Sequence, residues 1–216
     1  MTSHHDSAPD DDSALDAREM LALIDSQTST VRRAFESQTL VYYYAWGVAW
    51  LVGYLVYWAG SPGTTSPIQL PYVPAVVAFG TLILAAAVLS AVVGIRTNRG
   101  IKGVSDWVGT LYGLSWPVLG TAIAAVGVGL LRNGLTPELA TMFFTSMYAI
   151  MVAALYLAGA MLWRSVDQLV IAIIFAVAAG VTPFFGHPGN LLGMGLIAGP
   201  ALLVGGVIAT LRFRRL

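Results

Sequence analysis

Side chains that carry charge or exchange protons are scarce in this chain, and most lie near its beginning. Only 10% of the 216 residues are Asp, Glu, Lys or Arg, and eight of the 11 acidic residues precede residue 37. The other three are Asp106, Glu138 and Asp167, each at the edge of a long apolar stretch. An ionisable group deep in an apolar span would be a functional candidate, because burying it is costly. The sequence places none there, which disfavours proton-driven transport, intramembrane proteolysis and metal catalysis.

No catalytic motif replaces those groups. The chain has no Cys, no GxSxG and no HExxH, and its long apolar stretches contain no pair of Asp residues at helical spacing. His187 lies in a Gly-Pro turn, and the pair His4–His5 lies in a polar tail. We therefore interpret them as ordinary loop and tail residues in preference to metal ligands or proton-binding sites. We therefore predict a protein that is not an enzyme and that holds no cofactor and no metal.

One stretch carries a stripe of aromatic side chains. Tyr43, Trp46, Trp50, Tyr54 and Tyr57 are spaced by 3, 4, 4 and 3 residues, which places them on one face of a helix. Aromatic side chains at the ends of a span form the usual interfacial belt, but Trp50 falls near the centre. The stripe packs on neighbouring helices, or Trp46, Trp50 and Tyr54 offer a stacking and cation–π surface to an aromatic or cationic solute.

The composition requires elements that cross a membrane. Hydrophobic residues make up 57% of the chain, its mean hydropathy is +0.75, and its charged fraction lies well below the roughly 25% of soluble domains. A span needs roughly 20 apolar residues. We predict an all-α polytopic membrane protein, and exclude a soluble enzyme, a nucleic-acid-binding protein and a disulfide scaffold. The six predicted transmembrane helices of a domain covering 38–216 are 40–59, 70–95, 107–131, 139–163, 169–185 and 191–211.

Two segments precede these spans. Residues 1–12 are acidic and polar and predict a disordered tail. Residues 13–37 predict a cytoplasmic amphipathic helix, because apolar side chains recur there at spacings of 3 and 4. Its candidate partner-contact residues are Leu21, Ile24, Val31 and Phe35. The helix lies on the membrane surface or against a partner, or it is a solvated helix that leads into the first span.

The distribution of positive charge predicts the orientation. With the N-terminus inside and six crossings, ten of the 11 Lys and Arg residues fall on the inner side, and Arg132 alone falls outside. We therefore predict a cell-membrane protein with both termini in the cytoplasm. The inner loop 96–105 carries Arg96, Arg99 and Lys102, which could contact a cytoplasmic partner or anionic lipid headgroups. The orientation alone would also require these charges.

Small residues and prolines mark positions where helices could approach or bend. Pairs of small residues four apart let backbones come close in lipid. The pairs are Gly109 with Gly113, Ala154 with Ala158 and Gly195 with Gly199. Pro117 and Pro200 lie near the middle of the third and sixth spans and predict kinks. Both spans have a Gly-xxx-Gly pair followed by a proline, which also fits an inverted repeat, although their flanking sequences do not align. Packing within the chain or between two copies of a homodimer would use the same small residues.

Two segments carry a resemblance to known proteins. Residues 14–35 and 45–58 read ALDAREMLALIDSQTSTVRRAF and AWGVAWLVGYLVYW, and they resemble small bacterial six-span membrane proteins that are often filed as transporter-like or permease-like. The wider layout is similar to the membrane half of type-2 ATP-binding-cassette exporters. That resemblance implies a coupling loop at 96–105 and a separate cytoplasmic ATPase. The short GHPGN turn at 186–190 departs from it, and the chain has no Walker motif of its own.

Two functions stay open on the sequence. The first is the membrane subunit of a permease-like, dimeric transporter, which works with a separate ATPase. The second is a non-transporting membrane sensor, scaffold or assembly partner that recruits a cytoplasmic protein. A membrane enzyme acting on lipid-soluble substrates is disfavoured, because no acid–base or metal set is present.

Overall fold

A computed structural model describes residue 20 and residues 38–97 and 104–214. The predicted tail, the amphipathic helix with Leu21, Ile24, Val31 and Phe35, and the loop residues Arg99 and Lys102 lie outside the described residues.

Six helices make up the described chain, and no strand is present in it. All six are long and apolar enough to cross a membrane, which confirms the all-α prediction. The helices are the first span Gln38–Gly60, α2 Tyr72–Thr97, α3 Val104–Arg132, α4 Pro137–Trp163, α5 Val166–Val181 and α6 Gly189–Phe213. A short 3₁₀ helix, η1 Thr182–Phe185, continues α5.

Local capping explains where α3 ends and α4 begins. Gly134 has a φ of 97°, and its N–H and that of Leu135 donate to the last carbonyls of α3, at Leu131 and Leu130. This pattern is a Schellman motif, which needs a left-handed residue after the helix. Thr136 then caps α4 by accepting a hydrogen bond from the N–H of Leu139 at 3.3 Å, with Pro137 in the first turn. The helix α4 therefore begins at Pro137, two residues before the predicted span 139–163.

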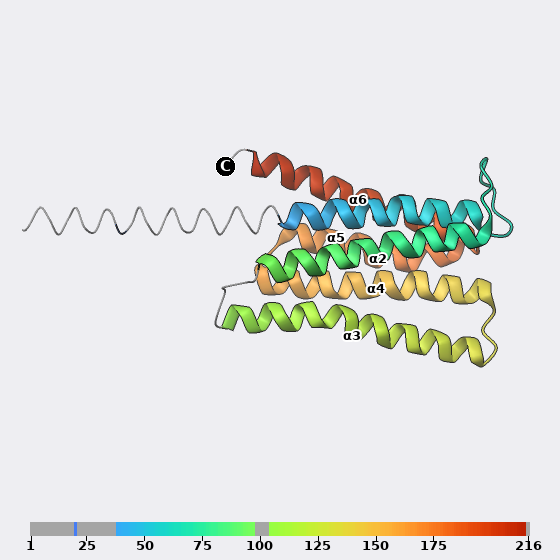
Figure 1. The fold of residues 1–216 in the computed structure, drawn as a ribbon, viewed down its shortest axis with the longest axis horizontal. Coiled ribbons are helices and arrows are strands. Elements are labelled where there is room, and N and C mark those ends of the chain that lie inside the picture. The colour runs from blue at the N-terminus through green and yellow to red at the C-terminus, as the bar shows by residue number, and fades with distance from the viewer. Residues whose placement is uncertain (1–19, 21–37, 98–103, 215–216) are drawn as a thin grey trace, which may run out of the picture.

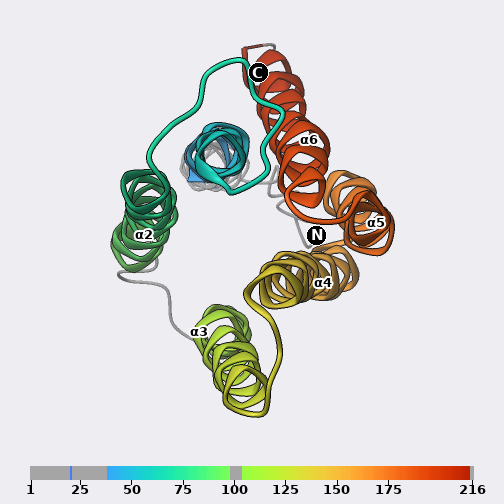
Figure 2. The same ribbon diagram turned by 90° about the vertical axis from the view of Figure 1, so that its right-hand side faces the viewer.

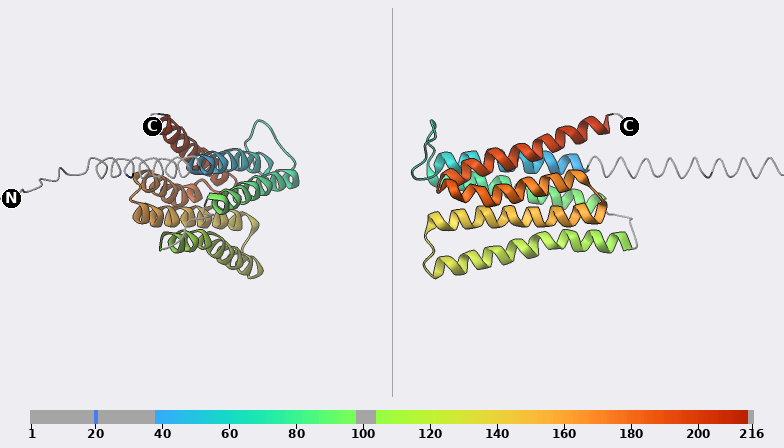
Figure 3. Two further views of the ribbon diagram at one scale, coloured as in Figure 1. Left: turned by 60° about the vertical axis from the view of Figure 1, so that its left-hand side comes forward. Right: turned by 180° about the vertical axis from the view of Figure 1, so that it is seen from behind.

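The helices run alternately up and down, so the bundle has two ends (Figure 1). We call one the His187 end; it holds residues 61–71, 133–136 and 182–189. The other is the Arg164 end, which holds the start of the first span, the turn between α4 and α5, and the last turn of α6. Figure 3 shows the same two ends from two further directions. The predicted orientation would place the His187 end outside the cell.

Seen along its axis, the bundle is an open arc whose two ends are α2 and α3 (Figure 2). The first span packs on α2 through Gly53 and Phe79 and on α6 through Gly199 and Leu51. Among the described residues, no Cα atom of α2 lies within 8 Å of a Cα atom of α3, α4, α5 or α6. In the most apolar stretch of α2, and likewise of α3, only 6% of the residues are buried inside the chain. These two helices therefore leave most of their apolar surface to their surroundings.

Close approach of the first span and α6 depends on glycine. A Cβ at Gly199 would lie 2.6 Å from the Cβ of Leu51, and one at Gly195 would lie 3.0 Å from the Cβ of Tyr54. On α3 the situation is the opposite, since a Cβ at Gly109 or Gly113 would have no atom within 4 Å. Of the predicted packing glycines, the structure therefore brings only the α6 pair against another helix of the chain.

The other predicted packing and kink positions are more peripheral. On α4, Ala154 is exposed and Ala158 is half-buried. Pro117 and Pro200 lie inside α3 and α6, and both helices continue through them. Figure 1 shows α3 changing direction along its length, as a missing backbone donor near the middle of the helix would favour.

Candidate functional site

The aromatic stripe of the first span forms the core of the bundle. Trp50 and Tyr54 are each 4% exposed, and the Trp50 ring lies edge-on to Phe175 of α5 with the centroids 4.9 Å apart. Tyr54 packs on Phe79 of α2 with the centroids also 4.9 Å apart. Their faces are covered by protein, so in this state Trp50 and Tyr54 pack on neighbouring helices and offer no surface to a solute.

Polar atoms of the same stripe tie the first span to its neighbours. Trp46 is half-buried and donates its indole N–H to the Ser90 hydroxyl of α2 at 2.9 Å. On the other side, the Tyr54 hydroxyl interacts with the Thr145 side chain of α4. One turn further toward the His187 end, the Tyr57 hydroxyl interacts in the same way with Thr141. The stripe thus fixes the relative depth of three helices.

Four polar side chains lie near the His187 end, and we call them the polar layer: Tyr57, Thr141, Thr182 and Asn190. Thr182 follows Phe175 by seven residues, about two helical turns, just as Tyr57 follows Trp50 by seven. On α6, Asn190 precedes Gly195, the neighbour of Tyr54, by five residues and so lies toward the same end. Four polar side chains from four segments therefore lie at similar depth.

Two members of the polar layer are buried without a hydrogen-bond partner. Thr182 is 0% exposed and Asn190 is 1% exposed. Among the described residues, the Thr182 hydroxyl has no partner, and neither does the oxygen or the nitrogen of the Asn190 amide. A buried polar group that has no partner, water included, costs about 1–3 kcal/mol relative to its hydrated state. In the closed bundle, the described residues supply no protein partner for either side chain that would offset this cost.

Sequence reasoning did not single out Asn190. The Gly-His-Pro-Gly-Asn run pointed to a turn, which accounts for the residue type without placing its side chain inside. A helical signal was present, since Asn190, Met194, Ala198 and Leu202 recur every four residues. All four are buried. Extending the apolar stripe of the sixth span by one turn would have predicted a buried amide.

His187 and Glu138 lie just beyond this layer. Burial lowers the pKa of His187 below its ordinary value of 6.5, and the nearby Glu138 carboxylate opposes that effect. The Nδ1 atom of His187 is buried and has no hydrogen-bond partner among the described residues. The environment therefore favours the neutral imidazole.

We expect acid to destabilise the protein through His187. Because the folded state has the lower pKa, the unfolded state binds the proton more readily, so stability is lost as the pH falls through 6.5. Thermal unfolding in detergent at about pH 7.5 and about pH 5 measures this loss. His187→Gln should reduce the difference between the two midpoints. An unchanged difference would show that other groups carry it.

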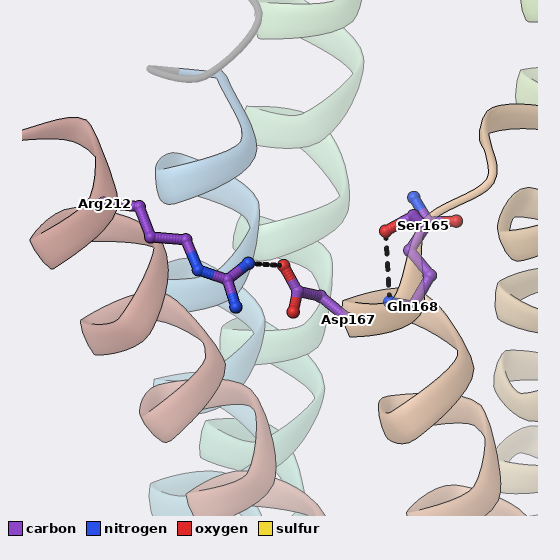
Figure 4. A network of polar contacts seen from close by, with 4 residues as sticks. All are labelled: Ser165, Asp167, Gln168 and Arg212. Carbon is purple, nitrogen blue, oxygen red and sulfur yellow. Dashed lines mark hydrogen bonds and ion pairs between the residues drawn. The ribbon is translucent and has the colours of Figure 1, made fainter. Parts of the chain in front are cut away.

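The Arg164 end holds a different polar cluster (Figure 4). Arg212, in the last turn of α6, donates to the Asp167 carboxylate in the first turn of α5 at 2.5 Å. Ser165 caps α5 by accepting a hydrogen bond from the N–H of Gln168 at 3.3 Å. Asp167 also lies at the N-terminal end of α5, where a negative charge is favoured. The Arg212 side chain is 63% exposed and the Asp167 side chain is 44% exposed. We therefore expect this ion pair to make only a small contribution to the packing of α5 on α6.

The remaining predicted site residues add no chemistry to either end. Arg96 lies in the last turn of α2 and is exposed. Within residues 38–97 and 104–214, no group of three or more His, Asp or Glu side chains could hold a metal ion. The described residues thus form a buried apolar core, a buried polar layer at one end and an ion pair at the other. No protein-family profile, characterised protein or solved structure matches this chain.

Proposed function

We propose that the chain is a non-transporting membrane module, a sensor or scaffold that recruits a cytoplasmic protein. In this proposal both termini lie in the cytoplasm, and the partner binds residues 13–37 and the loop 96–105. The lipid bilayer is its solvent, and nucleic acid and cofactors have no role.

One observation carries this proposal, the burial of large apolar side chains where the first span, α5 and α6 pack together. Between the polar layer and the Asp167–Arg212 pair, the core is closed by large apolar side chains. Phe175 and Met194 are 0% exposed and Leu202 is 2% exposed. A polar solute would have to displace these side chains over most of the membrane thickness, which costs far more than a local change at one end.

In this proposal, the polar layer allows a second, opened state of the His187 end. Opening the His187 end would hydrate the Asn190 amide and the Thr182 hydroxyl and so recover part of the cost of closing. The same opening would separate Tyr57 from Thr141. Because α6 and the first span run the length of the bundle, a shift at this end would reach the ends that carry the cytoplasmic segments.

The test is a comparison of two tagged proteins purified in mild detergent, the full chain and a chain without residues 13–37. We expect one cytoplasmic protein to purify with the full chain in constant ratio and to be lost with the deletion. An unchanged ratio after the deletion would contradict the proposal. Gel filtration of both proteins controls for folding of the membrane part.

A second candidate is the membrane subunit of a transporter that works with a separate ATPase. The observation that favours it is that α2 and α3, which are consecutive in the chain, do not pack on each other among the described residues but on different neighbours. An ATPase at the 96–105 loop could therefore move one of these helices relative to the other without breaking contacts between them. Stoichiometric copurification of an ATPase, with ATP-dependent solute flux in vesicles, would establish this function in place of the first.

A further inference from the structure

A notch at the Arg164 end lies where the chain turns from α4 into α5. Its volume is about 220 Å³, and it is lined by Leu157, Ala160, Met161, Arg164, Ser165, Val166 and Leu169. Only two residues, Arg164 and Ser165, connect the helices, so the side chains on either side of the turn form the walls. The notch is smaller than the roughly 300–1,000 Å³ of small-molecule pockets. Its size and apolar walls suit a segment of hydrocarbon chain.

The walls of the notch are open to the surroundings of the bundle. Met161 is 76% exposed and Val166 is 70% exposed. Leu157 lies seven residues before Arg164, so the apolar wall extends about 10 Å along α4 below the charged residue. For a helix that can cross a membrane, the surroundings of such a wall are acyl chains.

Arg164 places a positive charge at the mouth of this notch. It is exposed, and its φ of 50° puts it in the left-handed conformation that ends α4. Within the described part of the chain, no ion pair or hydrogen bond of its side chain is present, whereas Arg212 is neutralised by Asp167. A guanidinium group can bind a phosphate through two parallel N–H donors.

Aromatic side chains place this charge at the level of lipid headgroups. Trp163 precedes Arg164, is 48% exposed, and lies edge-on to Tyr112 of α3 with the centroids 4.7 Å apart. Tyr112 in turn donates to the Leu155 carbonyl at 3.2 Å, which holds α3 and α4 together there. Trp and Tyr side chains are enriched at the membrane–water interface.

We infer that this notch binds an anionic phospholipid, with one acyl chain between α4 and α5 and its phosphate on Arg164. Apolar walls alone would accept any lipid. The Arg164 guanidinium beside them, which forms no ion pair with any residue that the structure describes, adds a preference for a headgroup with net negative charge.

The absence of cysteine from the sequence allows a direct test. Met161→Cys carries a bimane fluorophore in the notch, and the protein is reconstituted in phosphatidylcholine vesicles that contain brominated phosphatidylglycerol or brominated phosphatidylcholine as quencher. We expect half-maximal quenching at an about five-fold lower fraction of phosphatidylglycerol than of phosphatidylcholine. A label at Leu84→Cys, which is 63% exposed on α2, should show no preference.

Two further arms assign the preference to Arg164. Arg164→Gln should remove the preference at position 161, and Arg164→Lys should keep most of it. Inorganic phosphate in the buffer should leave it unchanged. Equal quenching by the two lipids, a preference that survives Arg164→Gln, or loss of the preference to free phosphate would each overturn the inference. Gel filtration of each variant controls for folding.

Discussion

Gly199→Ala should strongly destabilise the protein. The added methyl group would lie 2.6 Å from the Cβ and 2.7 Å from the Cα and N of Leu51. Backbone atoms cannot rotate away as a side chain can, so the first span and α6 would have to separate. Overpacking typically costs about 1–3 kcal/mol and occasionally more, and we expect the upper part of that range. The unfolding midpoint in detergent, followed by gel filtration after heating, measures it.

The matched control is Gly109→Ala on α3. It belongs to the same Gly-xxx-Gly spacing and also lies inside a helix, but its added methyl group would meet no atom within 4 Å. Alanine is favoured over glycine inside a helix by about 0.5–1 kcal/mol, so this variant should be neutral or slightly more stable. Equal loss of stability in both variants would contradict the packing described for α6, or would indicate that α3 contacts another copy of the chain.

Thr182→Val should stabilise the closed bundle. Valine has nearly the shape of threonine, and the hydroxyl that it removes is fully buried without a partner. The expected gain is up to about 1–3 kcal/mol, the cost of an unsatisfied buried polar group. A higher unfolding midpoint in detergent would show this gain.

Thr145→Val makes the same chemical change where the hydroxyl has a partner. Thr145 is 4% exposed, and its side chain interacts with the Tyr54 hydroxyl. Removing it leaves that phenol without this partner in the core, so the variant should lose about 1–3 kcal/mol. We therefore expect the change in stability to have opposite signs in the two variants, a gain for Thr182→Val and a loss for Thr145→Val. Destabilisation by Thr182→Val would show that its hydroxyl is satisfied and would remove the energetic basis of the sensor proposal.

The spans could be predicted from the sequence because their signals are local. A run of apolar residues of sufficient length determines a span, and Thr136 with Pro137 determines where one begins. The neighbours of each helix could not be predicted in the same way. Gly109 with Gly113 and Gly195 with Gly199 have the same spacing, yet only the second pair meets another helix. That difference depends on contacts between the first and sixth spans, which are far apart in the sequence.

The candidate site shows the same division between local and long-range information. The aromatic stripe was visible as a pattern, and both of its interpretations were open. The fold brings Phe175 and Phe79 against Trp50 and Tyr54, which favours packing. Asn190 was missed because its local sequence describes a turn, while its burial follows from the way α6 continues inward. The Arg164 notch depends on the angle between two helices, which composition does not encode.

The most direct test of the account is the side of the membrane on which each end of the bundle lies. Single cysteines at Thr65 and Asn133 report the His187 end, and single cysteines at Arg96 and Arg214 report the Arg164 end. All four residues are exposed in the structure. In intact cells, a maleimide that cannot cross membranes should label the first two positions and should reach the other two only after the membrane is opened. Labelling of positions 65 and 96 from the same side would contradict the six crossings on which every proposal here depends.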